Sequence, residues 1–167
     1  MRRKNEDHEY AENSDPNTIP TEVIQSMVDN YRSNQLACIN ETLQIDDAHS
    51  IWFDMVTLKK FISDIEIEAH QVDPHVSEED LGIRLYYAAY PETTEEPVPE
   101  DYARRHTLIM VPTKKQDDLN YDFNPFESDC ETDTETALAL AAGIGREALA
   151  QNHGILVPPG NGTVESY

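Results

Sequence analysis

Alternating oxygen-bearing side chains over residues 118–124 form the pattern in this chain that comes closest to a metal site. The four residues are Asp118, Asn120, Asp122 and Asn124. Side-chain oxygens at every second position open the calcium-binding loop of EF-hand proteins. That loop needs a glycine for its sharp turn and a closing bidentate glutamate, where this chain has Phe123 and Asp129. The spacing therefore favours an acidic loop, and we expect no bound metal.

Histidine and cysteine spacing gives no second candidate. His70 and His75 stand on either side of Pro74, so one helix face cannot present both. Three other histidines are far apart, and only the fold could bring them together: His49, His106 and His153. Cys130 has an acidic residue on each side, which disfavours the nucleophilic thiolate. Cys38, near an apolar helix end, suits a small buried hydrophobe.

The one glycine pair that could cradle a phosphate is in Gly143-Ile144-Gly145, followed by Arg146. A dinucleotide-binding loop follows a strand, whereas the preceding ETALALAA is typical of a helix. The GKS/T of a phosphate-binding loop and the GxSxG of a serine hydrolase are also missing. The glycines therefore predict a helix kink, and we expect no cofactor. We predict a non-catalytic protein, with an enzyme of unrecognised type as an alternative.

The charge of the chain limits its partners. Its 167 residues predict one domain, and 12 Lys and Arg against 33 Asp and Glu give a net charge of −21. Phosphate backbones are held mainly by Lys and Arg, so the excess of acids disfavours nucleic acid and anionic membranes. Two functional interpretations remain, a basic protein partner or mimicry of a polyanion. The simpler alternative is a protein kept soluble by self-repulsion.

Targeting signals are also missing from the sequence. Arg2-Arg3-Lys4 is followed by polar residues where a signal peptide needs an apolar stretch. No apolar run approaches the ~20 residues that span a bilayer. Two cysteines make no disulfide framework. We therefore expect a cytoplasmic protein with free thiols and no membrane contact.

Two amphipathic helices are predicted in the first half of the chain. The first covers about 20–35, with an apolar stripe formed by Val23, Ile24, Met27, Val28 and Tyr31. The second follows a short extended stretch that ends at Phe53, and Asp54 is its expected N-cap. Its apolar face is formed by Leu58, Phe61, Ile62, Ile65 and Ala69. This helix, at about 55–70, should end before Pro74.

The two clearest strands are Leu81–Tyr90 and His106–Pro112. An acidic loop over 91–105 joins them, and a hairpin is the simplest topology. The first strand places Leu81, Ile83, Leu85, Tyr87 and Ala89 on one face, which we expect to be the core face. The residues predicted to be buried together are Trp52, Phe61, Ile83, Leu85 and Ile109.

The remaining segments complete the predicted organisation. Residues 116–135 contain eight acids and no Lys or Arg, which predicts a second acidic loop. Thr136–Ala142 and Arg146–Asn152 are expected to be helical, and Gly154 to end the last helix with Ile155 packed on Leu149. Residues 1–17 form a predicted disordered polar tail, 18–157 a single domain and 158–167 an extended or disordered end.

Several short blocks in this order resemble an uncharacterised family of small bacterial proteins of unknown function. The blocks are IPTEVIQSMVDNYR, SIWFDMVTLKKFI, LGIRLYYAAYP, HTLIMVPT and NHGILVPP. They cover roughly residues 19–159, and the acidic segments fall between them. The resemblance implies a compact α+β domain and no activity, cofactor or catalytic residue.

The predicted fold is therefore α+β, with a small, mainly antiparallel sheet from about 46–53, 81–90 and 106–112. The helices at 20–35 and 55–70 pack on it, and a short C-terminal helical segment closes one end.

Arg84, Tyr86 and Tyr90, on the second face of the first strand, are the candidate contacts for a partner. An arginine among aromatic side chains is typical of protein interfaces. The alternative is that a helix covers this face and Arg84 pairs with an acid. We predict a non-catalytic acidic protein that binds a basic protein partner, with the acids of 92–101 and 117–135 as attractants. A small-ligand-binding domain, with its cavity between sheet and helices, is the alternative.

Overall fold

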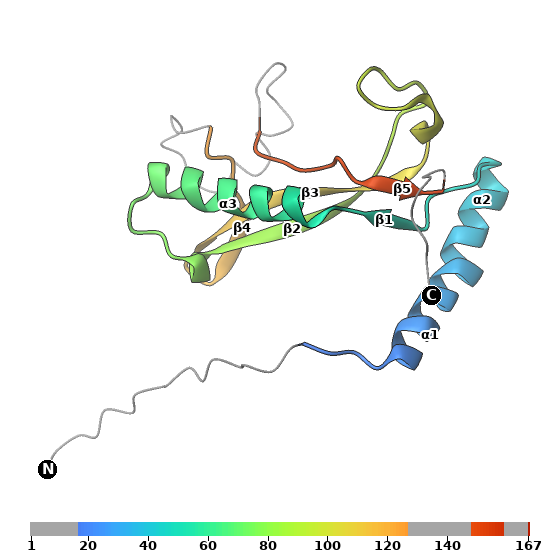
Figure 1. Ribbon diagram of the computed structural model, residues 1–167, viewed down its shortest axis with the longest axis horizontal. Coiled ribbons are helices and arrows are strands. Elements are labelled where there is room, and N and C mark those ends of the chain that lie inside the picture. The colour runs from blue at the N-terminus through green and yellow to red at the C-terminus, as the bar shows by residue number, and fades with distance from the viewer. Residues whose placement is uncertain (1–16, 127–147, 159–166) are drawn as a thin grey trace, which may run out of the picture.

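The computed structural model describes residues 17–126, 148–158 and 167, and its fold is α+β, as predicted (Figure 1). Five strands form two antiparallel sheets in this part of the chain. β2 (Leu81–Ala89), β3 (His106–Gln116) and β4 (Leu119–Asp122) make the larger sheet in that order. β1 (Ser50–Trp52) pairs with β5 (Ile155–Val157) in the smaller one. The expectation that β1 joins β2 and β3 in a single sheet is therefore wrong.

The β2–β3 hairpin is confirmed, with Leu85 opposite Met110 in the middle of the ladder. A short 3-10 turn at Glu100–Tyr102 lies in its long connection. β4 follows β3 through a tight turn at Asp117, whose φ is +55°. The segment 116–135 is therefore not all loop. Two of the four alternating oxygen-bearing residues, Asn120 and Asp122, lie in β4, where they follow the two-residue period of a strand.

The C-terminal segment is extended where a helix was predicted. Residues 148–150 have no regular structure, and Gln151 exchanges backbone hydrogen bonds with Met110 at 2.9 and 3.0 Å. Gly154 ends no helix. A Cβ at this buried glycine would lie 2.4 Å from Ile51 Cγ2 and 2.7 Å from Phe53 Cζ, so close packing requires the glycine. The predicted helix at 136–142 lies outside the described residues.

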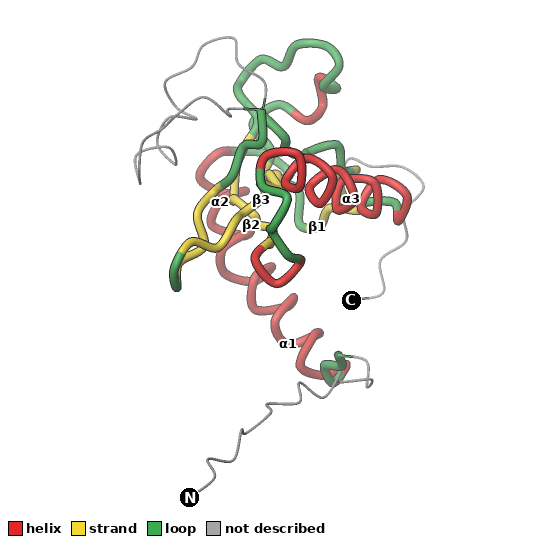
Figure 2. Tube along the Cα trace, turned by 90° about the vertical axis from the view of Figure 1, so that its left-hand side faces the viewer, coloured by secondary structure: helices red, strands yellow, loops and turns green. Residues whose placement is uncertain are grey.

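α3 (Met55–Val72) is confirmed together with its cap and its end. Asp54 Oδ1 accepts a hydrogen bond from the Thr57 amide at 2.9 Å, which satisfies one of the open amides of the first turn. The helix buries Phe61, Ile65 and Ala69, and Phe61 and Ile65 form the core with Met110 of β3. In Figures 1 and 2 the helix lies along one side of the larger sheet.

The first predicted helix is present but does not cover the sheet. α1 (Thr21–Tyr31), a π-helical turn (Arg32–Leu36) and α2 (Ala37–Leu43) run on as one helix, which ends at Gln44 with a φ of +53°. No residue of α1 is buried, and the helix extends beyond the end of the sheets (Figure 1). Among the helices of the described ranges, α3 alone packs on the sheet, in contrast to the expectation of two helices. No helix in the described ranges is long and apolar enough to cross a membrane.

The predicted core is correct only in part. Phe61 is 3 % exposed, whereas Trp52 is 49 %, Ile83 36 % and Leu85 50 % exposed. Ile109 is half-buried. α3 packs over Met110 of β3 and reaches only the first residues of β2, so the rest of that apolar face stays open.

Low pH should destabilise the fold, because the folded chain stabilises the ionised form of some carboxylates. A side-chain hydrogen bond from Thr57 lowers the pKa of Asp54 below its ordinary value, and one from Lys114 lowers the pKa of Asp73. Because these folded-state pKa values are depressed, the stabilisation is complete above about pH 4 and is lost as the pH falls through them.

We expect the difference in melting temperature between the wild type and Asp54→Ala to be constant from neutral pH to about pH 4. It should shrink at lower pH, because the carboxylate is then protonated in both the folded and the unfolded chain. Thermal melts followed by circular dichroism measure both proteins. A difference that already shrinks between pH 7 and 5 would contradict the assignment to Asp54.

Candidate functional site

Strand β2 lies at one edge of the larger sheet. Among the described residues its one neighbouring strand is β3. Met110 turns its N–H and C=O away from β2, towards Gln151, and Tyr90 donates its N–H to Arg105 at 2.9 Å. Hydrogen-bonded pairs alternate along an antiparallel ladder, so Leu85, opposite Met110, directs its own N–H and C=O outward. By the same alternation Ile83 and Tyr87 do so as well.

The side chains of these three residues are exposed on the core-side face. Leu85 is 50 % and Tyr87 92 % exposed, and Ile83 lies at the margin of α3. We call Ile83, Leu85 and Tyr87, with their outward backbone groups, the open edge. Natural proteins usually blunt such an edge with proline, lysine or a bulge, and β2 contains none of these over nine residues.

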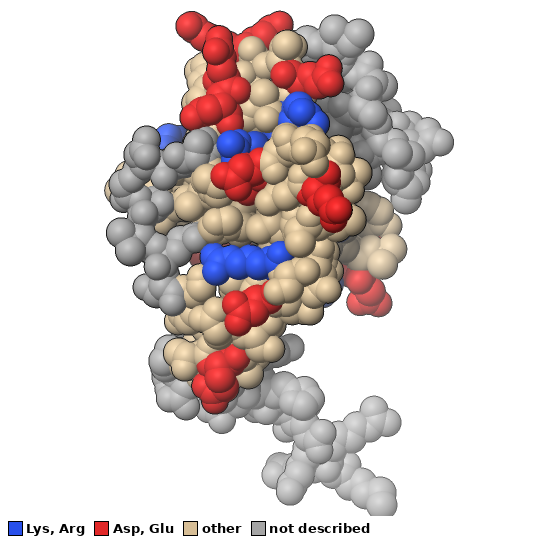
Figure 3. Space-filling model, turned by 90° about the vertical axis from the view of Figure 1, so that its right-hand side faces the viewer, with Lys and Arg blue, Asp and Glu red and all other residues tan. Residues whose placement is uncertain are grey.

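Acidic side chains lie at both ends of the open edge. Glu78 and Glu79 are exposed in the 3-10 turn that leads into β2. The connection after β2 carries five exposed acids: Glu92, Glu95, Glu96, Glu100 and Asp101. Figure 3 shows acidic side chains gathered at the top of the view, where this connection lies.

The structure brings two of the three predicted contact residues together. Arg84 pairs with the Asp122 carboxylate and donates to the Asn120 carbonyl at 2.8 Å. Tyr86 donates its hydroxyl to the other oxygen of Asp122. β4 thus supplies the acid that holds Arg84 and Tyr86 in place. The alternative interpretation, in which Arg84 pairs with an acid under a covering helix, is correct about the acid. The acid comes from β4, however, and not from a described helix.

Tyr90 belongs to a different group of side chains. Its ring packs against Tyr102, with ring centroids 5.6 Å apart, and its hydroxyl donates to Asn152 at 3.3 Å. Tyr90 is half-buried and connects the long β2–β3 connection with the C-terminal segment. A role of these residues in binding a partner stays a prediction.

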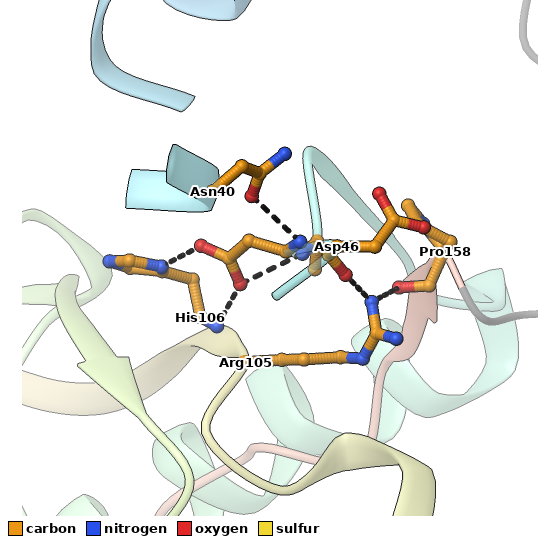
Figure 4. A network of polar contacts seen from close by, with 7 residues as sticks. Asn40, Asp46, Arg105, His106 and Pro158 are labelled. Atoms are coloured by element: carbon orange, nitrogen blue, oxygen red, sulfur yellow. Dashed lines mark hydrogen bonds and ion pairs between the residues drawn. The ribbon is translucent and has the colours of Figure 1, made fainter. Parts of the chain in front are cut away.

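A second polar site surrounds Asp47, which is fully buried. Its carboxylate accepts hydrogen bonds from the backbone amides of Ala48 at 2.8 Å and His106 at 2.7 Å, and it contacts Nδ1 of the His106 ring. Asn40 accepts from the Asp47 amide at 2.9 Å. Figure 4 shows Asn40, His106 and Arg105 meeting around this stretch of chain.

Arg105 completes the network through backbone carbonyls. It donates to the carbonyls of Asp46 and Pro158 and, at 2.7 Å, to that of Asp101. The Asp46–Asp47 stretch therefore joins the end of α2 to the start of β3 and the end of β5.

A cavity of about 560 Å³ lies next to this network. It is bounded by the helix that contains α1 and α2 on one side and by the starts of β1 and β3 on the other. His49 and His106 both line it, so the fold brings together two of the three scattered histidines, and His153 is not among the lining residues. Burial, followed by the negative charge of Asp47, raises the pKa of Tyr31, which also lines the cavity.

Sequence reasoning missed Asp47 because nothing local distinguishes it from the other acids of the chain. Its role depends on partners in α2 and β3 that are distant in the sequence. Trp52, predicted to be core, is instead exposed, as are Met55 and Val56, which follow it closely in the sequence. Among the described residues, no three metal-binding side chains come close enough to hold an ion.

No family model, no curated protein and no solved structure matches this chain. The resemblance to a bacterial family therefore stays a prediction.

Proposed function

We propose that this protein binds an extended, basic segment of a partner protein, which adds a strand to the open edge of β2. The single observation that carries the proposal is a long, unblunted edge strand with its backbone groups and apolar side chains exposed. Adding a strand to such an edge is a recurring mode of peptide recognition. Main-chain hydrogen bonds supply affinity in this mode, and alternate side chains supply specificity.

The two faces of β2 would contact an added strand differently. Side chains of the partner on one face would lie beside Leu85 and Tyr87, which favours apolar groups there. Those on the other face would lie beside Arg84 and Tyr86, where Asp122 already matches the charge of the arginine. This arrangement gives the predicted contact residues a role without requiring Tyr90.

Charge selects a basic partner over the other occupants of an open edge. A second copy of this chain would carry a net charge of −21 and would place acids of the β2–β3 connection near those of the 3-10 turn. Polyanions are repelled for the same reason. A segment with lysine or arginine at its ends would meet the acids that flank the edge on both sides, which speeds association and fixes the register.

The proposal is tested with synthetic peptides of defined chemistry and the full-length protein. One peptide has a core of alternating valine and threonine flanked by lysines, and its control has glutamates in place of the lysines. We expect the lysine-flanked peptide to bind, with an affinity that falls as the salt concentration rises, and the glutamate-flanked peptide to bind far more weakly. Equal binding of the two peptides would contradict a preference for basic segments.

Replacing Leu85 with proline should weaken binding of the lysine-flanked peptide by about tenfold or more. Proline removes an N–H that points away from β3, so the hairpin ladder is retained. The matched variant Leu85→Thr keeps the N–H and removes apolar surface, and it should bind with a smaller loss. Isothermal titration calorimetry measures both variants, and melting temperatures check their folding.

A peptide with a methylated amide on its pairing edge supplies a measurement that needs no change in the protein. It should lose affinity to the same degree as the proline variant, because the same hydrogen-bond ladder is interrupted. Unchanged affinity in both experiments would rule out strand addition.

A further inference from the structure

We propose that the cavity beside Asp47 and His106 is a second binding site, for a small apolar molecule that carries one hydrogen-bond donor such as an amine or an alcohol. This inference goes beyond the proposed function, and the two sites share one residue, Tyr87, which belongs to the open edge and lines the cavity. The cavity volume of about 560 Å³ is in the range of small-molecule sites.

The walls of the cavity are mainly apolar. Ile39 of α2, Ile51 of β1 and Leu108 of β3 line it, and the exposed Met27 and Tyr87 lie among the residues around it. Such walls favour a ring or a short hydrocarbon chain, since burial of apolar surface stabilises a bound ligand. They provide no reason to bind a highly polar molecule.

His106 supplies a hydrogen-bond acceptor at this apolar surface. A carboxylate can only accept, so the contact between Asp47 and Nδ1 places a proton on that ring nitrogen. In the neutral ring Nε2 then carries a lone pair. Nε2 has no partner among the described residues, and the ring lines the cavity. A ligand that donates a hydrogen bond to Nε2 therefore completes the network that begins at Asp47.

The charge around the cavity favours a cationic or neutral donor over an anion. Asp47 is fully buried beside the cavity, and its contacts are two amides and one imidazole rather than Lys or Arg. The raised pKa of Tyr31, caused by burial and then by Asp47, agrees with a negative potential there. One positive charge lies near the cavity, because Arg32 approaches the lining residue His49 at 3.4 Å. The same guanidinium group donates a hydrogen bond to the backbone oxygen of Tyr167 at 2.6 Å.

Four probes of nearly equal size test the proposal on the full-length protein. They are 2-phenylethylamine, 2-phenylethanol, ethylbenzene and 3-phenylpropionate. Each probe is titrated into the protein, and amide chemical shifts are followed in NMR spectra. Binding should change the amide shifts of Ile39, Ile51 and Leu108. We expect the amine to bind most tightly, the alcohol next, ethylbenzene more weakly and the carboxylate weakest of all.

Two variants separate the acceptor from the cavity itself. His106→Asn keeps an amide nitrogen at the position of Nδ1, so the contact with Asp47 is retained while the Nε2 acceptor is lost. It should reduce the affinity for the amine and the alcohol by about tenfold and leave ethylbenzene unchanged. Ile39→Trp places a larger side chain in the cavity and should weaken binding of all four probes. Both variants should still bind the lysine-flanked peptide at β2.

The nitrogen chemical shift of His106 Nε2 in the wild type gives a readout that depends on no variant. It should move when 2-phenylethylamine is added and stay unchanged with ethylbenzene. The proposal is overturned if none of the probes perturbs the lining residues at millimolar concentration. It is also overturned if the carboxylate binds as well as the amine, or if Nε2 does not respond to the amine.

Discussion

Replacing Phe61 with alanine is expected to lower the free energy of unfolding by about 3–5 kcal/mol. The ring is 3 % exposed and packs in the core with Ile65 and Met110, where it attaches α3 to β3. Its removal leaves a cavity between helix and sheet that neighbouring side chains fill only in part. Urea denaturation followed by far-UV circular dichroism measures the change.

The adjacent residue Ile62 provides the control. Its side chain lies on the same helix but is exposed, so Ile62→Ala should cost less than about 1 kcal/mol. Similar losses for the two variants would mean that α3 does not pack as described.

Replacing Asp47 with alanine is expected to cost about 3–5 kcal/mol as well, because each buried donor left without its acceptor costs roughly 1–3 kcal/mol. The backbone amides of Ala48 and His106 would lose their acceptor, and the His106 ring would lose its contact at Nδ1. Urea denaturation gives the free energy, and NMR spectra report the shifts of the two amides.

Asp46 is the matched control for Asp47. Its side chain is exposed, and it contributes a backbone carbonyl to the network, which Asp46→Ala retains. This variant should be nearly as stable as the wild type. Equal destabilisation by the two alanine substitutions would show that charge, and not the buried carboxylate, accounts for the effect.

Local features of the fold could be predicted because their causes lie within a few residues. Asp54 caps α3 through an amide three residues later, and the stripe of apolar residues in α3 repeats with the helical period. The β2–β3 hairpin follows from two strands with clear patterns on either side of a turn-rich loop.

Features that depend on distant partners could not be predicted. The pairing of β1 with β5 joins residues about a hundred positions apart, and the role of Gly154 depends on contacts with Ile51 and Phe53. The same holds for Asp47, whose partners lie in α2 and β3.

The exposure of the open edge could not be predicted from the two-residue period of β2. Alternation correctly placed Ile83, Leu85 and Tyr87 on one face, but it does not say whether another element covers that face. A helix is about 10 Å wide and strands lie about 4.8 Å apart, so one helix covers roughly two strands. α3 lies over β3, and α1 faces Tyr87 across the cavity, so the middle of β2 stays uncovered.

Hydrogen exchange along β2 tests strand addition most directly. In the unbound protein the amides of Arg84, Tyr86 and Ala88 should be protected by the ladder with β3, whereas those of Ile83, Leu85 and Tyr87 should exchange rapidly. Adding the lysine-flanked peptide should protect the second set and remove the alternation. If the peptide binds while Ile83, Leu85 and Tyr87 continue to exchange at their original rates, β2 does not accept an added strand.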